Sequence, residues 1–338
     1  MRHVEVYREQ GRFCGWPANQ GLWSWGGVKA NDPFEVVVGF SLAYMKLDVV
    51  NTLHRIDRNR PGSTVQARSR DGGDTWILET DKLPPGPPRL FSGRIRFDDP
   101  NFGMKSHNSQ FYLTYDRAKS WEGPYRLPLS DELGIQARTD YQVLGPKECL
   151  VFLTAAKTNG KEGRVYCIHT DDGGANWTFR SWIGPEPVGY SIMPSSLRLP
   201  SGRLLCAIRR YEPGEGDTQN CFIELWSSDD VGKTWTFMNE PTTTGQHSGN
   251  PPALIRLRDG RLALTYAYRS APYGIRARVS EDEGVTWSDE IHLRDDGGEA
   301  DLGYTRTVQR PDGDVITVYY YNVDPMGERF IGGTIWTP

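Results

Sequence analysis

Short runs of apolar and β-branched residues, separated by turns that contain glycine and proline, recur along the chain. Clear examples are Leu204–Ile208, Cys221–Trp226, Leu262–Tyr266 and Ile275–Val279, and the turn Pro200–Gly202 precedes the first of them. Runs of this length between turn residues are typical of β-strands rather than of helices. The pattern therefore predicts an all-β protein made of short antiparallel strands.

One motif, Ser/Thr-x-Asp-x-Gly-x-Thr-Trp, recurs through the chain with variations. Its copies are Ser69–Trp76, Thr114–Trp121, Thr170–Trp177, Ser228–Trp235 and Ser280–Trp287. Successive copies lie 45 to 58 residues apart, the length of one four-stranded unit. The second copy has lost its glycine and the third is weaker. We predict one four-stranded unit for each copy.

The residue types of this motif have a physical reason. The aspartate can accept hydrogen bonds from the backbone N–H groups of its own turn, and the glycine can adopt a positive φ. The tryptophan then buries a large ring against neighbouring strands. We therefore interpret Asp71, Asp172, Asp230 and Asp282 as turn-forming residues.

The last repeat is followed by only three strand patterns, at Tyr304–Gln309, Val315–Tyr321 and Arg329–Trp336. The alternating segment His3–Tyr7 can supply a fourth strand, so that both ends of the chain close one blade and leave no exposed sheet edge. We predict a six-bladed β-propeller of four-stranded antiparallel blades, forming a single domain over residues 1–338.

Charge and composition exclude several classes of function. Lys and Arg number 39 against 43 Asp and Glu, a formal charge of −4, so no broad basic field exists for a nucleic acid. The longest apolar runs, such as Cys149–Leu153, are too short to cross a bilayer. We therefore expect neither a nucleic acid nor a membrane as a partner.

Cysteine and histidine usage indicates the cellular compartment and the absence of a metal site. The five cysteines show no C-x-x-C spacing and indicate buried thiols in a reducing compartment. The N-terminal segment lacks the features of a signal peptide, so we expect a cytoplasmic protein, or a secreted one if a signal was removed. The six histidines show no zinc-binding pattern, and we expect no metal and no cofactor.

The repeated Asp boxes and their spacing resemble the sialidase (neuraminidase) superfamily over essentially the whole chain. That resemblance implies a tyrosine nucleophile assisted by a glutamate, an aspartate as acid/base, and three arginines that hold a carboxylate. By resemblance, Tyr304 matches the nucleophile and Glu224 is a candidate partner. Arg210 and Arg269 close corresponding strands and are candidates for the carboxylate clamp.

Position in a propeller gives a wider set of residues, because loops that enter inner strands and the ends of second strands face the central funnel. The catalytic candidates are Tyr304, Glu224, His54, Asp57, His107 and Tyr141. The substrate-binding candidates are Arg12, Trp16, Asn19, Arg94, Arg138, Arg210, His247, Arg269, Arg276 and Arg306. Asn250 and Asp301 also fall at funnel-facing positions.

Three functions fit this set. The first is an exo-acting glycoside hydrolase on a terminal, acidic sugar, because arginines suit a carboxylate and aromatic rings suit sugars. The second is a lyase in which His54, His107 or Tyr141 removes the proton next to a uronate carboxylate that Arg138 neutralises. The third is a non-catalytic glycan-binding propeller. Each takes a carbohydrate partner, while the sugar, the linkage and the oligomeric state stay open.

Overall fold

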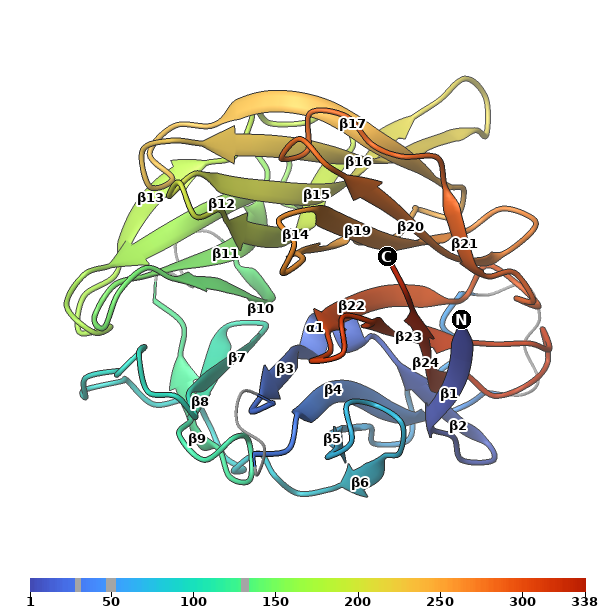
Figure 1. Ribbon diagram of the computed structural model, residues 1–338, viewed down its shortest axis with the longest axis horizontal. Coiled ribbons are helices and arrows are strands. Elements are labelled where there is room, and N and C mark those ends of the chain that lie inside the picture. Colours follow the sequence, from blue (N-terminus) through green and yellow to red (C-terminus); the bar gives the residue numbers. More distant parts are fainter. Residues whose placement is uncertain (28–31, 47–52, 129–133) are drawn as a thin grey trace. The chain divides into compact units, whose positions relative to one another are not determined.

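The computed structural model describes residues 1–27, 32–46, 53–128 and 134–338. The chain divides into two compact units, Met1–Asp81 with Thr242–Pro338 (unit 1) and Lys82–Pro241 (unit 2). Within the described ranges the structure contains six β-sheets and one short helix, α1 (Pro17–Gln20), so the expected all-β class is confirmed (Figure 1).

Unit 1 contains three antiparallel sheets. One joins β2 (Arg12–Gly15), β4 (Glu35–Tyr44), β5 (Ser63–Ser69) and β6 (Ile77–Glu79), with β3 (Leu22–Trp25) also paired to β4. The next joins β18 (Ala253–Arg256), β19 (Leu262–Tyr268), β20 (Gly274–Ser280) and β21 (Ile291–Arg294). The third joins β1 (Arg2–Tyr7), β24 (Phe330–Trp336), β23 (Val315–Tyr321) and β22 (Gly303–Gln309).

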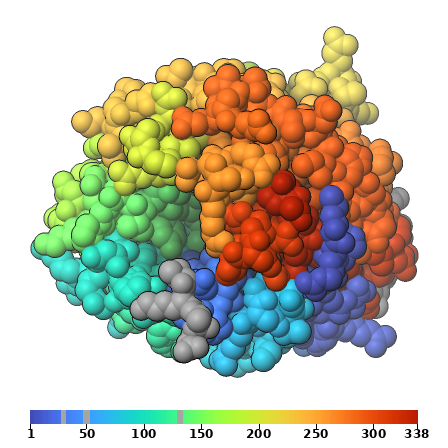
Figure 2. Space-filling model, viewed as in Figure 1, coloured from blue at the N-terminus to red at the C-terminus, as the bar shows by residue number. Residues whose placement is uncertain are grey.

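The two terminal strands lie side by side in this third sheet. β1 pairs antiparallel with β24, from Arg2 opposite Ile335 to Tyr7 opposite Ile331. Figure 2 shows the dark blue N-terminal strand against the dark red C-terminal region. The predicted sharing of one blade by the two ends of the chain is therefore confirmed.

Unit 2 also contains three antiparallel sheets. The first has three strands among the described residues, β7 (Gly103–His107), β8 (Gln110–Thr114) and β9 (Glu122–Arg126). The second joins β10 (Gln136–Val143), β11 (Cys149–Ala156), β12 (Glu162–Thr170) and β13 (Thr178–Trp182). The third joins β14 (Tyr190–Arg198), β15 (Leu204–Pro213), β16 (Gln219–Ser228) and β17 (Thr236–Gly245), which continues into unit 1.

Within the described ranges, the sheet of β7, β8 and β9 does not extend regularly beyond β9. As in the other sheets with an Asp box, the strand after the box is the last in the order. Beyond it the segment before β7 makes the isolated bridge between Arg89 and Tyr125. That segment contains Pro84, Pro85, Pro87 and Pro88, which cannot donate backbone hydrogen bonds to a neighbouring strand, so it does not add a regular strand beside β9.

The Asp boxes fold as their residue types predict. Asp71 Oδ1 accepts the backbone N–H groups of Asp74 at 3.0 Å and Thr75 at 2.9 Å, while Ser69 Oγ accepts the N–H of Gly73 at 2.7 Å. Burial acts to raise the pKa of Asp71, but these and related hydrogen bonds lower it to about 2. In the copy without glycine, Ala118 takes the left-handed conformation at φ 58°.

The hydrophobic cores lie between neighbouring sheets of the same unit. In unit 1, buried side chains of β19, β20 and β21 pack against those of β23 and β24, with Trp336 completely buried. In unit 2, one core joins β7–β9 to β10–β13, and another joins β10–β13 to β14–β17. All five cysteines are free and buried, as predicted. In the described part of the chain there is no helix long and apolar enough to span a membrane.

Candidate functional site

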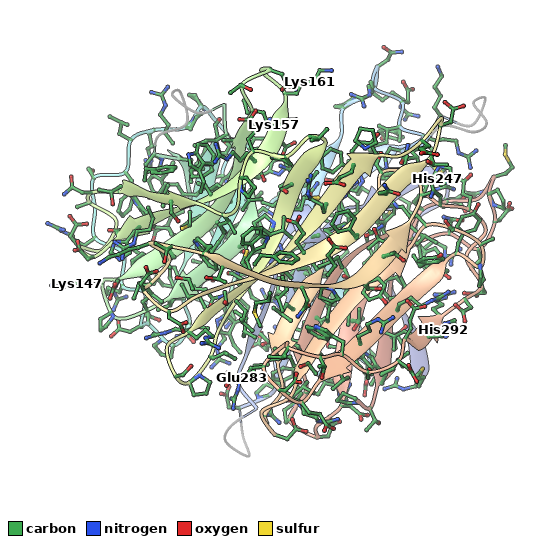
Figure 3. All side chains as sticks on the ribbon, turned by 90° about the horizontal axis from the view of Figure 1, so that it is seen from above. Lys147, Lys157, Lys161, His247, Glu283 and His292 are labelled. Atoms are coloured by element: carbon green, nitrogen blue, oxygen red, sulfur yellow. The ribbon has the colours of Figure 1, made fainter. Side chains whose placement is uncertain are left out.

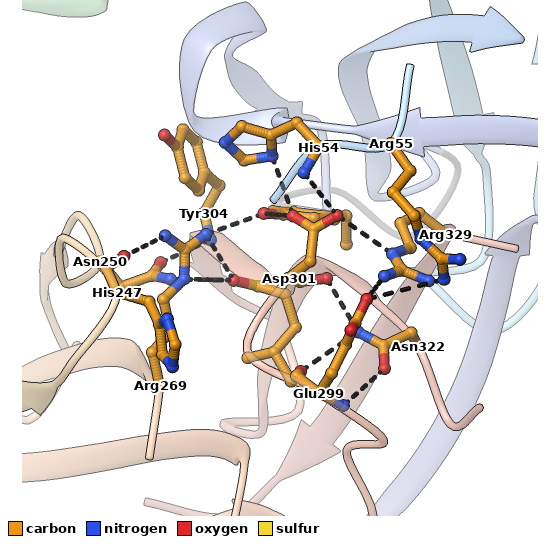
Figure 4. Close-up of polar contacts among 12 residues, drawn as sticks. His54, Arg55, His247, Asn250, Arg269, Glu299, Asp301, Tyr304, Asn322 and Arg329 are labelled. Carbon is orange, nitrogen blue, oxygen red and sulfur yellow. Dashed lines mark hydrogen bonds and ion pairs between the residues drawn. The ribbon is translucent and has the colours of Figure 1, made fainter. Parts of the chain in front are cut away.

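His54 and Asp301 form a pair in unit 1 in which the carboxylate is fully buried and the imidazole is partly exposed (Figure 4). His54 lies in the segment between β4 and β5 and has φ 58°, and its backbone N–H donates to Asp301 Oδ2 at 3.1 Å. The imidazole Nδ1 lies 2.9 Å from Asp301 Oδ1. Because Asp301 engages both the backbone and Nδ1, it fixes the ring and leaves Nε2 for proton transfer. The His54 side chain keeps 28% of its surface exposed, whereas that of Asp301 has none.

The charge of Asp301 is stabilised by several donors. Tyr320 donates its hydroxyl to Oδ1 at 2.9 Å, and Arg329 donates Nε–H to Oδ2 at 3.1 Å. Burial would raise the pKa of Asp301, but the hydrogen bond and charge of His54 and the charge of Arg269 lower it below its ordinary value. Asp301 is therefore a carboxylate at neutral pH, suited to orient His54 and to stabilise its protonated form.

Tyr304 stands beside this pair at the start of β22. Its ring centroid lies 6.5 Å from that of His54 in an edge-on arrangement, and 5.7 Å from that of Tyr320. Tyr304 has φ 56°, and its backbone N–H donates to Asn250 Oδ1 at 2.7 Å. At the preceding Gly303, with φ 112°, a Cβ atom would come within 2.4 Å of the Asn250 side chain. Glycine at this position therefore permits the close approach that fixes Tyr304.

Arg269 binds the backbone just before Tyr304. Its Nε and Nη2 donate to the carbonyl of Leu302 at 3.2 and 3.1 Å, and Nη1 donates to the carbonyls of His247 and Gly249. Nη2 also donates to the hydroxyl of Tyr320 at 2.8 Å. All five N–H groups of this buried guanidinium thus have protein acceptors. Hydrogen bonds connect Arg269 through Tyr320 to Asp301 and His54.

A group of charged residues, Arg329, Glu299 and Arg55, lies next to Asp301. Arg329 forms ion pairs with Asp301 and Glu299, and Arg55 lies 3.7 Å from Glu299. Asn322 donates to the backbone carbonyl of Asp301 at 2.8 Å and accepts the N–H of Glu299. Burial, together with the charge of Arg55, lowers the pKa of Arg329 to about 9. Arg329 still carries its charge at neutral pH, because that value lies above 7.

Aromatic side chains border His54. The Trp16 ring lies edge-on to His54 with centroids 5.0 Å apart, and Phe13 packs against Trp16 at 4.9 Å. Trp16 has φ 61° and precedes α1, where Asn19 donates its backbone N–H to the carbonyl of Trp16. Arg306 donates to the carbonyl of Ala18 in the same helix. Of the predicted residues, Trp16 thus borders His54 directly, while Asn19 and Arg306 bind the backbone of the segment that carries Trp16.

Other candidates of unit 1 have local roles. The carboxylate of Asp57 accepts the backbone N–H of Asn59 at 3.0 Å and forms a turn, whereas the carboxylate in contact with His54 is that of Asp301. Arg12 stacks over Tyr44 and donates to a backbone carbonyl, and buried Arg276 is bound by Glu290 and Asp295. His247 is exposed and contributes its carbonyl to Arg269.

The candidates of unit 2 form separate groups. Burial is the largest cause of a lowered pKa at His107. The positive charges of Lys105 and Arg138 add to it, and the pKa falls to about 4. Burial lowers the pKa of Lys105 to about 7. Arg138 is paired with Glu162, and Tyr141 packs into the core while its hydroxyl accepts the N–H of Met104 at 3.2 Å. We therefore regard Tyr141 as a packing residue.

Three further candidates in unit 2 are bound to one another or to a turn. Arg210 Nε donates to Glu224 Oε1 at 3.0 Å, and Trp226 Nε1 donates to Oε2 of the same carboxylate at 3.1 Å. Glu224 is thus occupied within its own sheet. Arg94, predicted at the funnel, is exposed and binds the Asp-box turn at Asp172. Its position at a turn-forming box argues against a role in substrate binding.

The residues that complete the cluster around Asp301 differ in how well sequence signals them. Asp301 and Asn250 occupy positions expected to face the funnel. Tyr320 stands in an apolar strand and has the pattern of a packing residue, and nothing local marks Glu299, Asn322 or Arg329. Among the described residues no group of three or more His, Cys, Asp or Glu could hold a metal ion. His54, with one ring nitrogen beside a buried carboxylate, has the arrangement of a residue that can transfer a proton.

Comparison with known proteins places this geometry in context. The sequence profile of the BNR repeat-like domain matches residues 97–317. Among curated proteins no sequence matches significantly. A protein of unknown function from Dyadobacter fermentans has a solved structure with a TM-score of 0.70 and 24% identity, covering 98% of this chain and 97% of that one.

Two solved enzymes have a similar fold at lower identity. An α-L-arabinofuranosidase from Fusarium graminearum gives a TM-score of 0.60 at 11% identity, covering 100% of this chain and 98% of that one. The NanB sialidase from Streptococcus pneumoniae gives 0.55 at 10% identity, covering 94% of this chain and 68% of that one.

These likenesses concern the fold. With the sheets described above, they confirm the expected six-bladed β-propeller class and the resemblance to the sialidase superfamily. The profile match extends over more than half of the chain and includes four of the five Asp-box copies, from Thr114–Trp121 to Ser280–Trp287. The chain therefore belongs to the family of proteins with a BNR repeat-like domain.

Proposed function

We propose that this protein is a glycoside hydrolase that removes a terminal sugar, with His54 as its proton-transfer residue. One observation carries the proposal: a buried, ionised Asp301 holds Nδ1 of the partly exposed His54, with Tyr304 alongside. Solved proteins with this fold include an α-L-arabinofuranosidase and a sialidase, which supports a carbohydrate substrate.

The three side chains suit the roles of nucleophile, base and orienting group. Tyr304 attacks the anomeric carbon through its phenolic oxygen, and His54 takes the phenolic proton. The bond between the anomeric carbon and the leaving oxygen breaks, and His54 returns the proton to that oxygen. Water then attacks the anomeric carbon and the bond between Tyr304 and the sugar breaks, while His54 takes a proton from the water and passes it to the departing phenolate of Tyr304. Asp301 stabilises the imidazolium formed in each half of the reaction.

A neutral terminal sugar fits the arginines better than the acidic one expected from sequence. All seven arginines predicted to bind substrate make polar contacts with protein atoms: Arg12, Arg94, Arg138, Arg210, Arg269, Arg276 and Arg306. A substrate carboxylate would have to displace these partners, at the cost of leaving buried polar groups unpaired. The same argument disfavours a uronate lyase, which also needs a free cation for the carboxylate.

Turnover of a panel of aryl glycosides tests the proposal. Aryl α-L-arabinofuranosides and other neutral glycosides should release their phenol, whereas an aryl sialoside and an aryl glucuronide should react more slowly. A uronate-containing oligosaccharide, followed by ultraviolet absorbance of an unsaturated product, covers the lyase alternative. Binding of a glycan without any turnover would favour the non-catalytic alternative and contradict the proposal.

Two variants assign the chemistry. His54→Gln should lower kcat by about 10²- to 10⁴-fold, the usual contribution of a general acid–base residue. His292→Gln removes an exposed histidine of the same unit and should leave kcat unchanged. Tyr304→Phe should abolish turnover while substrate still binds. Full activity of Tyr304→Phe would remove this residue from the mechanism and leave His54 as acid/base for a different nucleophile.

A further inference from the structure

A pocket lies in unit 1 at the Asp-box end of the sheet β18–β21, away from the cluster around His54. It has a volume of about 630 Å³, within the range of small-molecule sites. Its lining residues are Arg261, Val279, Glu281, Thr286, Trp287, Ser288, Asp289, Glu290, Ile291 and Pro338. None of these residues belongs to the cluster around His54. We propose that this pocket binds a neutral sugar unit of a glycan, as a non-catalytic site.

Trp287 supplies the aromatic wall of the pocket. A tryptophan ring offers a large apolar face, and the C–H face of a sugar can pack on it while the hydroxyl groups point outward. The indole N–H of Trp287 is buried and has no acceptor among the residues that the structure describes. In two other boxes this donor is used: Trp76 donates to the Gly73 carbonyl at 2.9 Å and Trp235 to Ser181 at 3.1 Å. The indole N–H of Trp177 is buried without an acceptor in the described part of the chain, like that of Trp287, so the apolar face of Trp287 is the feature that it contributes to the pocket.

Two acidic side chains supply acceptors. The side chains of Glu281 and Asp289 are exposed and make no hydrogen bond or ion pair with other residues in the described ranges, although the backbone carbonyl of Asp289 accepts from Ser288 Oγ at 2.8 Å. Carboxylates accept hydrogen bonds from sugar hydroxyl groups without having to give up a partner in the free protein. These two residues are therefore available to a ligand.

The remaining polar wall is held in place. Glu290 accepts from Tyr266 at 2.6 Å and from Arg276 at 3.1 Å, and Arg261 is bound to Asp259. Ser288 accepts the backbone N–H of Val279 at 3.0 Å. A wall fixed in this way loses little conformational freedom when a ligand binds.

The charges of the pocket select among ligands. Glu281, Asp289 and Glu290 outnumber Arg261, so the lining is net negative and repels an acidic sugar. Arg261 on the same wall disfavours an organic cation, while its N–H groups can donate to hydroxyl oxygens. Both donors and acceptors therefore face the pocket, and sugar hydroxyl groups can act as either. No three-residue metal-binding group occurs in the described part of the chain.

Equilibrium binding to the full chain tests this site separately from the proposed hydrolase. Calorimetric titration uses the His54→Gln variant, which is expected to bind without cleaving, and the probes are arabinotriose, cellotriose, a glucuronate-containing trisaccharide and choline. If the pocket binds a sugar in addition to the site at His54, the protein should bind two molecules of one neutral trisaccharide. The pocket should bind neither the acidic trisaccharide nor choline.

Adding Glu281→Gln and Asp289→Asn to His54→Gln should weaken one of the two binding events by about tenfold, the loss expected for hydrogen bonds to charged groups. The matched control is Glu283→Gln, which changes an exposed carboxylate of the same turn outside the pocket (Figure 3). Trp287→Phe, which keeps a ring at the box, should weaken the same event with little loss of stability.

The outcomes separate the two proposals. Binding of one molecule that the pocket variants leave unchanged would overturn the second site and leave the hydrolase intact. Binding that only the pocket variants weaken would support the second site even if no glycoside is cleaved. Binding of choline or of the acidic sugar to the pocket, in place of neutral sugars, would also overturn the assignment.

Discussion

Two histidine–aspartate pairs in unit 1 have nearly the same nitrogen–oxygen distance and very different surroundings. His54 Nδ1 lies 2.9 Å from Asp301 with that carboxylate fully buried, and His292 Nδ1 lies 2.8 Å from Asp295 with 43% of the carboxylate side chain exposed. Water screens the second pair, and exposed ion pairs typically contribute less than about 1 kcal/mol. The distance alone therefore does not identify a functional pair.

The partners of the two carboxylates explain the difference. Asp301 is also bound by Tyr320 and Arg329, neither of which can recover a hydrogen bond from water if the carboxylate is lost. His292 and Asp295 are three residues apart on the surface, and Asp295 also pairs with Arg276. The buried pair fixes one orientation of an imidazole, whereas the exposed pair leaves its histidine free to exchange partners.

The largest effect should come from Asp301→Asn. The carboxamide removes the negative charge that Arg329 and His54 share, and we expect a loss of about 3–5 kcal/mol in the free energy of unfolding. Turnover should fall by about 10³-fold or more, because His54 loses its orientation. Urea unfolding and kcat measure the two losses. Asp295→Asn is the matched control, and similar losses in both variants would mean that burial does not separate the pairs.

His107 in unit 2 sharpens the comparison, because it has cationic neighbours in place of a carboxylate. Burial, followed by the charges of Lys105 and Arg138, lowers the pKa of His107 to about 4. An unfolded histidine titrates near pH 6.5, so between these values the unfolded chain binds more protons than the folded one. The free energy of unfolding is therefore highest above about pH 6.5. It falls by about 2–3 kcal/mol as the pH drops toward 4.

Urea unfolding at several pH values between about 7 and 4 measures this loss. His107→Gln should flatten the pH dependence within that window, because the variant has no imidazole to protonate. His292→Gln should leave the pH dependence as it is in the unaltered protein. An unchanged slope in His107→Gln would show that other groups cause the acid sensitivity.

Local signals explain which parts of the structure the sequence predicts. Each Asp box makes its bonds within about eight residues, so the turns, their spacing and the all-β class follow from the motif. The shared sheet of β1 and β24 follows from counting strands. The boxes depend on short-range geometry and the shared sheet on a count of strand patterns, and both can be read from the order of residues.

The site depends on contacts between residues far apart in the chain. Asp57 is three residues from His54 and matches the expected acid/base, but the carboxylate that binds His54 is 247 residues away. Alternation indicates which side of a strand an arginine occupies, but not that Arg210 meets Glu224 or that Arg269 is saturated by carbonyl groups. Tyr320 has the pattern of a core residue until its hydroxyl is seen between Arg269 and Asp301.

A smaller effect should follow from Asn250→Ala. Asn250 binds the N–H of Tyr304 at 2.7 Å and the carbonyl of Leu302 at 2.9 Å. Its loss should cost about 1–3 kcal/mol of stability, since both groups are buried, and should lower kcat more than it raises KM. Asn239→Ala, at a residue outside this cluster, is the control. An equal change in kcat and KM would mean that Asn250 supports the fold without positioning Tyr304.

The smallest effect should come from the exposed pair itself. His292→Asn removes an imidazole that contacts Asp295 and Glu290 at the surface, and we expect a change below about 0.5 kcal/mol in the free energy of unfolding. Raising the salt concentration should remove even this difference, because screening weakens exposed pairs more than buried ones. Urea unfolding at low and high salt measures it. A loss above 1 kcal/mol that persists in high salt would show that exposure does not set the contribution of such a pair, and the contrast with His54 and Asp301 would then need another cause.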